Sequence, residues 1–343
     1  MKRRLELVVA LSVIALVGTG AKSASAQEFA SVPDTVEQGA PSVFLVDWPA
    51  TDEDSVRGGA SGGEELGRKA FLSLESASEG RVLSTECFPA DQSDVQSAEQ
   101  SRWACIAGVP STLDPGDYSV TVVLGSPQGT TELEHSLEVV SRDFNTETIS
   151  LNRDLTKMRS EPDPRKAEEA KSLRELVATF RPDAVYHRGP FVIPVEDGRR
   201  TSDFGDRRTY RYVDGASAGA VHYGIDIAAD TGTPVRAGGG GRVVMVADRV
   251  ISGTTVVIEH LPGVYGLHYH LDSASVSEGD IVEARDVIGE VGASGLATGA
   301  HLHWEVRVSG VPVEPEELLS TALIDIEANS ENIGVEVRSQ EGR

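Results

Sequence analysis

The second half of the chain consists of short runs rich in β-branched residues, separated by dense glycines, and no long helical pattern interrupts them. From Phe191 onward these runs include residues 241–246, 254–260 and 301–306. Runs of this length and composition, bounded by turn residues, are typical of β-strands. Because no helix is available to connect parallel strands, neighbouring strands should pair antiparallel. We therefore expect an antiparallel β-domain over residues 191–320.

The first half also contains short β-like runs. They occupy residues 42–46, 70–74, 103–107 and 118–124, and the turn sequence DPGDY at 114–118 leads into the last of them. Short strands separated by turn residues predict a β-sandwich of immunoglobulin-like outline. The whole chain should therefore be mainly β, with an accessory sandwich over residues 27–143 and a glycine-rich loop at 57–67.

A connector of residues 144–190 joins the two predicted domains. Pro162 and Pro164 are compatible with the start of a helix but not with its interior. Residues 165–180 are good helix formers with one apolar stripe, formed by Ala170, Leu173, Leu176, Val177 and Phe180. We expect an amphipathic helix that packs between the two domains. At the other end of the chain, an acidic tail of residues 321–343 has no predicted role.

The N-terminus has the pattern of an export signal. Three basic residues at 2–4 precede a mostly apolar run at 5–17, and the small residues Ala24, Ser25 and Ala26 follow. The apolar run is shorter than the roughly 20 residues that a membrane-spanning helix needs. We expect residues 1–26 to be a cleaved signal peptide and the mature chain to lack a stable membrane span. An uncleaved anchor is the alternative, and the expected location is the periplasm, the cell envelope or the medium.

The net charge and the cysteine content limit the kinds of partner and the cellular compartment that fit this chain. The formal net charge is −23, and removing residues 1–26 changes it by −3, to −26. A chain of this charge repels nucleic acid phosphates, so binding of DNA or RNA is disfavoured. Cys87 and Cys105 are the only cysteines. In an exported protein such a pair favours a disulfide, here within the predicted sandwich, over a redox or zinc site.

Six of the eight histidines follow Phe191. Two pairs of residues in this part of the chain stand at the spacing of metal ligands. His222 and Asp226 are four residues apart, and on a strand residues at that spacing share a face. His301 and His303 are two residues apart, so on a strand both imidazoles point to the same side while Leu302 points into the core. Each pair alone is a weak signal, because such spacings also arise on ordinary sheet surfaces.

A third element, His268 and His270, follows the same two-residue spacing. One of its histidines could therefore face the same cleft. A catalytic zinc ion takes three protein ligands and leaves a fourth position for water. His222, Asp226 and one histidine of the 301/303 pair complete such a set. The remaining histidines are free to act as general base or as donor to an oxyanion.

The segment 201–319 resembles the catalytic domain of the lysostaphin/LytM zinc metallopeptidases. Residues 201–207 (TSDFGDR), 226–235 (DIAADTGTPV) and 288–295 (IGEVGASG) are similar to the family patterns TSxFGxR, DIAxxxGTPV and IGxxGxTG. Residues 297–300 then precede the HLH of 301–303. In this family zinc is bound by an HxxxD motif and the second His of an HxH motif. The resemblance therefore implies zinc binding by His222, Asp226 and His303, with His270 and His301 as catalytic residues beside the bound water.

Two positions depart from the family pattern. His268 stands where Tyr is usual and Ala300 where Pro is common, and neither change removes a ligand or a base. We expect His260 and His268 to be structural or substrate-lining residues, and His135 and His187 to be ordinary surface residues.

The resemblance implies an exported zinc endopeptidase that hydrolyses peptide bonds in peptidoglycan, in the stem peptide or the cross-bridge, through a zinc-activated water. The alternative within the family is a non-catalytic LytM-type regulator of cell-wall amidases. Loss of a metal ligand distinguishes such regulators, and here every ligand position is filled. Two further alternatives are a secreted protease for other proteins and a binding module centred on the N-terminal domain. Even with a complete site, the connector at 144–190 could cover the cleft.

Overall fold

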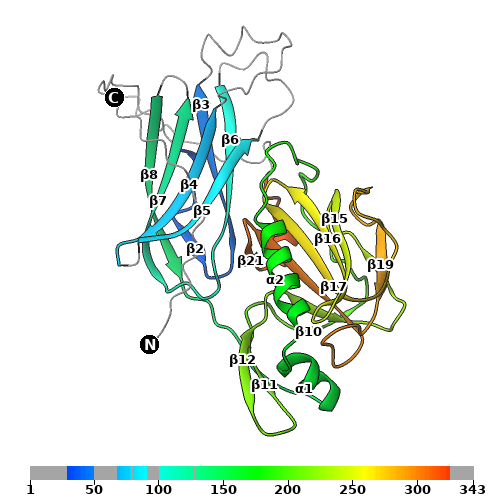
Figure 1. Cartoon of the computed structure of the whole chain (residues 1–343). Coiled ribbons are helices and arrows are strands. Elements are labelled where there is room, and N and C mark those ends of the chain that lie inside the picture. Colours follow the sequence, from blue (N-terminus) through cyan, green and yellow to red (C-terminus); the bar gives the residue numbers. More distant parts are fainter. Residues whose placement is uncertain (1–28, 50–67, 79, 91–99, 127–128, 325–343) are drawn as a thin grey trace, which may run out of the picture.

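The structure is a computed structural model that describes residues 29–49, 68–78, 80–90, 100–126 and 129–324. Two β-structures stand beside each other, joined by a connector that carries two helices (Figure 1). Within the described part of the chain, no helix has the length and apolar character needed to cross a membrane. The predicted signal peptide at 1–26, the glycine-rich loop at 57–67 and residues 325–343 of the predicted tail lie outside the described residues.

The N-terminal unit is one eight-stranded sheet in the order β1-β3-β6-β5-β4-β7-β8-β2. Its strands are β1 (Phe29–Ser31), β2 (Thr35–Glu37), β3 (Pro41–Pro49), β4 (Lys69–Ser76), β5 (Gly80–Pro89), β6 (Gln100–Gly108), β7 (Gly116–Ser126) and β8 (Gly129–Val140). Alternate residues of β4 and β7 point into a buried cluster that also holds Trp48 and Trp103. The four strand runs expected in this half are therefore confirmed.

The strand pairing differs from that of an immunoglobulin-like sandwich. All eight strands belong to one hydrogen-bonded sheet, whereas a sandwich has two separate sheets. Seven of them pair antiparallel within the path, and the short β2 adds to β8 in parallel. The immunoglobulin-like detail of the prediction is thus not confirmed. The expected disulfide between Cys87 and Cys105 is present, and it joins directly opposed residues of the neighbouring strands β5 and β6.

The connector contains β9 (Thr146–Ser150), α1 (Arg153–Ser160) and α2 (Pro164–Val177). The Asn152 side chain accepts a hydrogen bond from Leu155 N and so caps α1, and Asp163 caps α2 in the same way, with Pro164 as the first helical residue. The predicted helix therefore forms. Its buried residues Leu173 and Val177 belong to a cluster whose other members are on the C-terminal sheet.

The C-terminal unit is a ten-stranded sheet in which every strand pairing is antiparallel, as expected from the sequence. It contains β10 (Arg199–Ser202), β13 (Ile225–Ala228), β14 (Pro234–Arg236), β15 (Gly241–Arg249), β16 (Gly253–Leu261), β17 (Val264–Ala274), β18 (Ile281–Val282), β19 (Val287–Val291), β20 (His301–Val308) and β21 (Val311–Val313). The short helix α3 (Glu317–Ser320) follows. A separate three-stranded sheet, β12-β11-β9, combines the connector strand with β11 (Arg207–Arg211) and β12 (Ser217–Val221).

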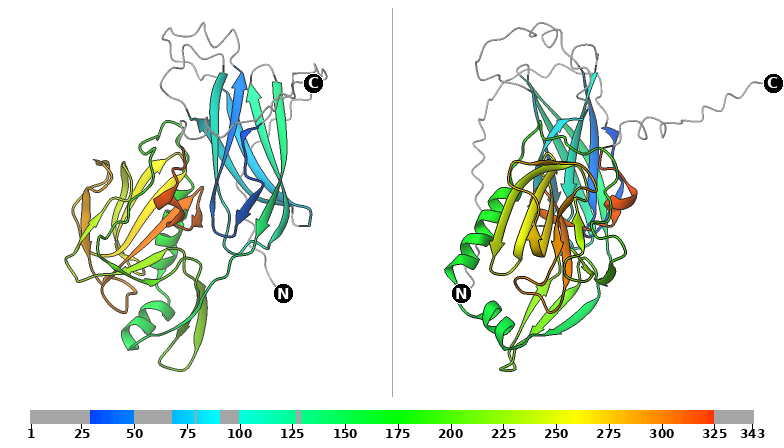
Figure 2. Two further views of the ribbon diagram at one scale, coloured as in Figure 1. Left: turned by 180° about the vertical axis from the view of Figure 1, so that it is seen from behind. Right: turned by 90° about the vertical axis from the view of Figure 1, so that its right-hand side faces the viewer.

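One hydrophobic core continues from the C-terminal sheet into the N-terminal one. Phe88 and Ile106 of the N-terminal sheet belong to the same buried cluster as Trp304 and Val306 of β20. The ion pair between Arg142 and the buried Glu314 also crosses this boundary, at 2.6 Å. The two units therefore pack side by side through a shared buried core (Figure 2). At the far end, Leu323 and Ile324 join this core, so the first residues of the predicted acidic tail are part of the fold.

Candidate metal centre and cleft

Three residues from two neighbouring strands and the loop before one of them form the centre. His222 lies in the loop between β12 and β13, Asp226 lies on β13, and His303 lies on β20. β13 and β20 pair antiparallel, and their register places Asp226 directly opposite His303. His222 and Asp226 therefore share a site although they do not share a strand. Gly224 permits this arrangement, because a Cβ atom there would lie 2.3 Å from Trp304 O and 2.9 Å from His303 Nε2.

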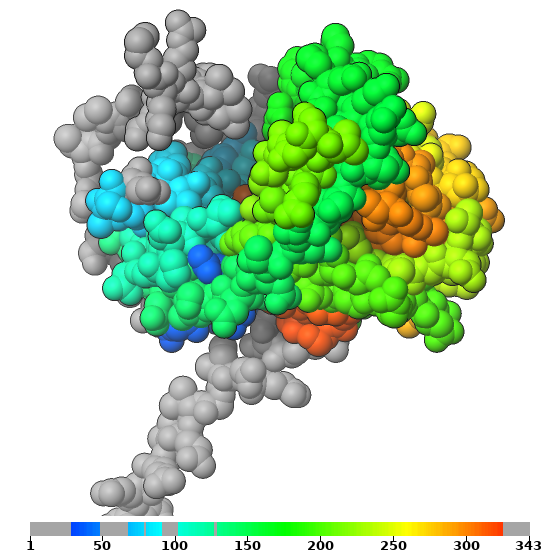
Figure 3. Space-filling view, turned by 90° about the horizontal axis from the view of Figure 1, so that it is seen from below, coloured from blue at the N-terminus to red at the C-terminus, as the bar shows by residue number. Residues whose placement is uncertain are grey.

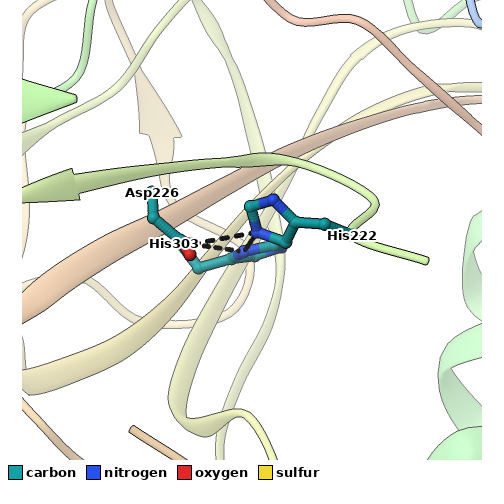
Figure 4. Close-up of side chains that lie close together, drawn as sticks. All are labelled: His222, Asp226 and His303. Carbon is teal, nitrogen blue, oxygen red and sulfur yellow. Dashed lines mark hydrogen bonds and ion pairs between the residues drawn. The ribbon is translucent and has the colours of Figure 1, made fainter. Parts of the chain in front are cut away.

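The side-chain atoms of the three residues converge on one point (Figure 4). Asp226 Oδ1 lies 3.0 Å from His222 Nε2 and 2.9 Å from His303 Nδ1, and the two nitrogens are 2.9 Å apart. All three residues are buried, and their ligand atoms lie within 4.8 Å of one another. Two imidazole nitrogens and one carboxylate oxygen facing one point form a donor set that suits a cation, and zinc in particular.

Neighbouring groups orient each ring. His222 Nδ1 donates to the carbonyl oxygen of Asp203 at 2.7 Å, which leaves Nε2 to face the centre. The ring of Tyr269 stacks on His303, with ring centroids 5.2 Å apart and an interplanar angle of 3°. Glu305 lies 3.8 Å from the outer nitrogen of His303. Such outer contacts fix the tautomer and the orientation of a metal-binding imidazole.

The electrostatics of the centre reflect this crowding. Burial opposes ionisation of Asp226, but hydrogen bonds from His222 and His303 outweigh it and hold the pKa of Asp226 well below its usual value. Burial also lowers the pKa of His222. For His303, burial is outweighed by the hydrogen bond to Asp226 and by the nearby carboxylate of Glu305, which raise its pKa to about 9. A carboxylate that stays ionised is the state in which Asp226 can bind a metal ion.

The two residues predicted to be catalytic lie beside this cluster. His301 is the first residue of β20, its Nδ1 bonds to Gly299 O at 2.8 Å, and its Nε2 lies 3.7 Å from Asp226 Oδ1. His270, on β17, bonds through Nδ1 to Ser294 O at 2.8 Å, and its ring centroid is 4.8 Å from that of His301. Each ring is thus held by a carbonyl at Nδ1, which leaves Nε2 as the nitrogen available for proton transfer.

His268 and His270 do not share a face, although their spacing follows the same rule as that of His301 and His303. His268 is fully buried on the core side of β17, opposite Trp304. His270 has a positive φ of 63°, and the register of β17 shifts at this point. The left-handed backbone turns the His270 side chain toward His301, out of the alternation that the sequence implied. Such a conformation is uncommon for a residue other than glycine and typical of functional sites.

Burial keeps His270 and His260 neutral. The pKa of His270 is lowered to about 3 by burial and by the nearby His301 and His303. His260 is fully buried and bonds through Nδ1 to Gly240 O at 2.8 Å, and burial lowers its pKa to about 3. Its structural role is as expected. His187 is not a simple surface residue, because it is half-buried and its ring contacts both Phe191 and His260.

The centre opens into a cleft with a volume of about 1040 Å³. One side is formed by the loops and strands that carry His222, His270 and His301, and the other by β9, α1, α2 and the β11–β12 hairpin. From below, the hairpin and the connector form a green ridge beside the orange surface of the C-terminal unit (Figure 3). The sequence analysis placed the connector at the cleft as a possible cover, and the structure shows it as a wall of the cleft. The sequence did not reveal that Arg208 and Tyr269 reach the centre.

Arg208 directly follows the TSxFGxR pattern, and that position was the one sequence signal near it. Its guanidinium donates to Asp226 Oδ2 at 2.6 Å. Sequence spacing could not predict that Arg208 pairs with Asp226, because Arg208 lies on β11 and Asp226 lies on β13, in a different sheet.

Residues 220–315 match the model of peptidase family M23. Among curated proteins, the DD-carboxypeptidase/endopeptidase Mpg of Neisseria meningitidis serogroup B is 45% identical over 95 residues, or 28% of this chain and 22% of that protein. The peptidoglycan DD-endopeptidase ShyB of Vibrio cholerae is 42% identical over 94 residues, or 27% of this chain and 22% of that protein. The chain thus spans about a fifth of the length of these relatives.

Among solved structures, a family M23 peptidase structure from Pseudomonas aeruginosa is similar with a TM-score of 0.53 and 24% sequence identity. The match covers 82% of this chain and 96% of that one. At this identity the similarity concerns the fold alone, and it reaches well beyond the 220–315 segment.

Proposed function

We propose that this chain, whose residues 220–315 match the model of peptidase family M23, is an exported zinc endopeptidase that hydrolyses peptide bonds in peptidoglycan. The observation that carries the proposal is the convergence of His222, Asp226 and His303 within 4.8 Å, with His270 and His301 beside them in an open cleft. A buried donor set of two nitrogens and one oxygen fits zinc and leaves a coordination position free. Zinc bound there supplies a Lewis acid and a water that ionises near neutral pH.

His270 and His301 are proposed to move the protons of the reaction. Each ring donates its Nδ1 hydrogen to a backbone carbonyl, so a neutral ring carries a lone pair on Nε2. One ring accepts a proton from the water that attacks the scissile carbonyl, and that proton passes to the amide nitrogen as the C–N bond breaks. The other ring, when protonated at Nε2, donates a hydrogen bond to the oxygen of the tetrahedral intermediate.

The charge of the cleft supports an anionic peptide as substrate. The whole chain has 31 basic and 54 acidic residues. The cleft lining reverses this balance, because its acidic members Glu147, Glu169, Asp226 and Glu305 are outnumbered by basic ones: Arg159, Lys166, Arg174, Arg199, Arg208, Arg249 and Arg307. Stem peptides of peptidoglycan carry free carboxylates, which a basic lining attracts. Binding to an anionic wall is therefore favourable at the cleft, although the protein as a whole is acidic.

The alternative of a regulator with a covered site is less well supported. Such a protein would need a missing ligand or a blocked cleft. The connector lines the cleft instead of filling it, since the cleft that α2 and the centre both line has a volume of about 1040 Å³. A secreted protease for other proteins shares the same chemistry and differs in substrate alone.

The test measures metal content and muropeptide release by the purified chain, with His222→Ala and His301→Ala as variants. We expect one zinc per chain in the parent protein, loss of zinc in His222→Ala, and retained zinc without cleavage in His301→Ala. Digestion of casein but not of purified sacculi would show that the substrate is another protein and not peptidoglycan. Absence of stoichiometric zinc in the parent protein would contradict the proposed chemistry.

A further inference from the structure

The two carboxylate oxygens of Asp226 have different partners. Oδ1 faces the nitrogens of His222 and His303, while Oδ2 accepts a hydrogen bond from Arg208 Nη2 at 2.6 Å. The side chains of Asp226 and Arg208 are 8% and 9% exposed, so the pair is shielded from solvent. Charge-assisted hydrogen bonds of this length are stronger than neutral ones, and burial protects them from screening.

Arg208 reaches Asp226 from outside the sheet that carries the ligand candidates. It lies on β11, which pairs with β9 in parallel, and the register places Arg208 opposite Glu147. Arg208 Nε donates to Glu147 Oε2 at 3.2 Å. Two of its donor nitrogens are therefore engaged by two carboxylates, which fixes the plane of the guanidinium.

The neighbouring Arg207 points the other way, because successive side chains of a strand alternate. It donates to the carbonyl oxygen of Ser111 in the N-terminal unit at 2.7 Å and lies over the ring of Phe144. β11 thus places one arginine against the N-terminal unit and the next one against the candidate metal centre.

We propose that Arg208 is a positioning residue of the metal centre and that Glu147 orients it. This inference rests on the proposed function, since it assigns a role at the same site. By occupying Oδ2, the guanidinium leaves Oδ1 as the single oxygen that Asp226 presents to the metal ion. A ligand restricted in this way keeps the coordination number low and the fourth position open. The engaged and buried guanidinium is not available as a mobile anchor for substrate.

Two effects of Arg208 on the metal ion oppose each other, and their balance is measurable. Fixing Asp226 strengthens binding, because the carboxylate does not have to be ordered when the metal ion binds. A cation close to a dication weakens binding, and Glu147 offsets part of this repulsion. The proposal requires the first effect to prevail, so removing the guanidinium must lower zinc affinity.

The experiment compares Arg208→Gln, Arg208→Lys and Glu147→Gln with the parent chain. Arg211→Gln is the matched control, an exposed arginine on the same strand. Zinc affinity is measured by competition with a chromophoric chelator, and ligand geometry by the visible spectrum of the cobalt-substituted protein. Neither readout depends on peptidoglycan cleavage, so both remain decisive if the proposed substrate is wrong.

We expect Arg208→Gln to lower zinc affinity about 10- to 100-fold, the usual effect of losing an outer partner of a metal ligand, and to alter the cobalt spectrum. Arg208→Lys should recover part of the affinity, and Glu147→Gln should show a smaller loss of the same kind. Arg211→Gln should match the parent. Zinc affinity at or above the parent value in a folded Arg208→Gln protein would overturn the proposal. If that variant does not fold, parent-like affinity and spectra in both Arg208→Lys and Glu147→Gln would overturn it instead.

Discussion

Asp226 and His303 are direct cross-strand partners in the antiparallel pair β13–β20, and their facing atoms, Oδ1 and Nδ1, are 2.9 Å apart. Both residues are buried, and the pairing joins positions separated by 77 residues in the chain. The carboxylate is thus held in place by the ladder of the sheet and does not depend on a flexible loop. Ligands on sheet backbone are held more rigidly than ligands on loops, which favours a defined geometry at Asp226 and His303, whereas His222 lies in the loop before β13.

Replacing the carboxylate should remove the metal ion without unfolding the protein. Asp226→Asn keeps the shape of the side chain and its cross-strand position, but it removes the negative charge that a divalent cation requires. We expect zinc affinity to fall by more than about 100-fold, beyond the usual effect of losing an outer partner. Chelator competition measures the change. Asp230→Asn is the matched control, since Asp230 is exposed just beyond the same strand; equal affinities for the two variants would contradict the assignment of Asp226.

Substitutions of His270 and His268 should distinguish a catalytic histidine from a structural one. His270→Asn tolerates the positive φ of 63° and should stay folded with its zinc. Its kcat/KM for muropeptide cleavage should fall about 10²- to 10⁴-fold, because proton transfer is lost. His268→Gln, two residues away but buried in the core, should retain cleavage. The reverse pattern, with activity kept in His270→Asn and lost in a folded His268→Gln protein, would show that the cleft histidine is misassigned.

The buried His260 should make stability sensitive to acid. Burial lowers its pKa from 6.5 to about 3 in the folded state. The pKa of His260 in the unfolded chain is 6.5, so its contribution to stability is fully present above pH 6.5. That contribution is lost as the pH falls from 6.5 toward 3. Below about pH 6, this residue alone should lower the free energy of unfolding by about 1.4 kcal/mol per pH unit.

Urea denaturation of the parent and of His260→Gln across this pH range measures that contribution. Gln keeps a donor for the Gly240 carbonyl but does not titrate, so the variant should lose stability less steeply as the pH falls. Other groups that titrate in both proteins cancel in the comparison. Parallel pH profiles for the two proteins would mean that His260 is protonated without cost in the folded state.

The basic lining of the cleft should raise affinity for peptides that carry carboxylates. Arg159 lies over the ring of Tyr210, and Arg174 is exposed on α2. We expect Arg159→Gln/Arg174→Gln to raise KM for an acidic stem peptide about 3- to 10-fold, since each charge near the surface contributes up to about 1 kcal/mol. KM for the same peptide with amidated carboxyls should change little.

Added salt should narrow the difference between parent and double variant, because it screens exposed charges. Arg81→Gln is the control, as Arg81 is 62% exposed on the N-terminal sheet, away from the cleft. An equal rise in KM for the acidic and the amidated peptide would indicate that the substitutions disturb the shape of the wall and not its charge.

Local patterns in the sequence were sufficient for much of this structure. The alternation of a strand predicted that Leu302 enters the core while His301 and His303 face one side, and the structure has this arrangement. The helix after Pro164 and the disulfide between Cys87 and Cys105 were also predicted from the chain alone. These features depend on neighbours in the sequence or on the chemistry of single residues, so one chain is enough to infer them.

Other features were decided by the tertiary structure. The sequence pattern did not reveal that the N-terminal strands join one sheet, that His270 turns away from the face of His268, or that Arg208 reaches Asp226 from a different sheet. Local sequence is compatible with more than one strand register, and a positive φ at a histidine is locally unfavourable. Contacts with residues distant in the chain select both. By itself the sequence determined which residues could hold a metal ion, and the pairing of β13 with β20 and of β11 with β9 decided how they are brought together and held.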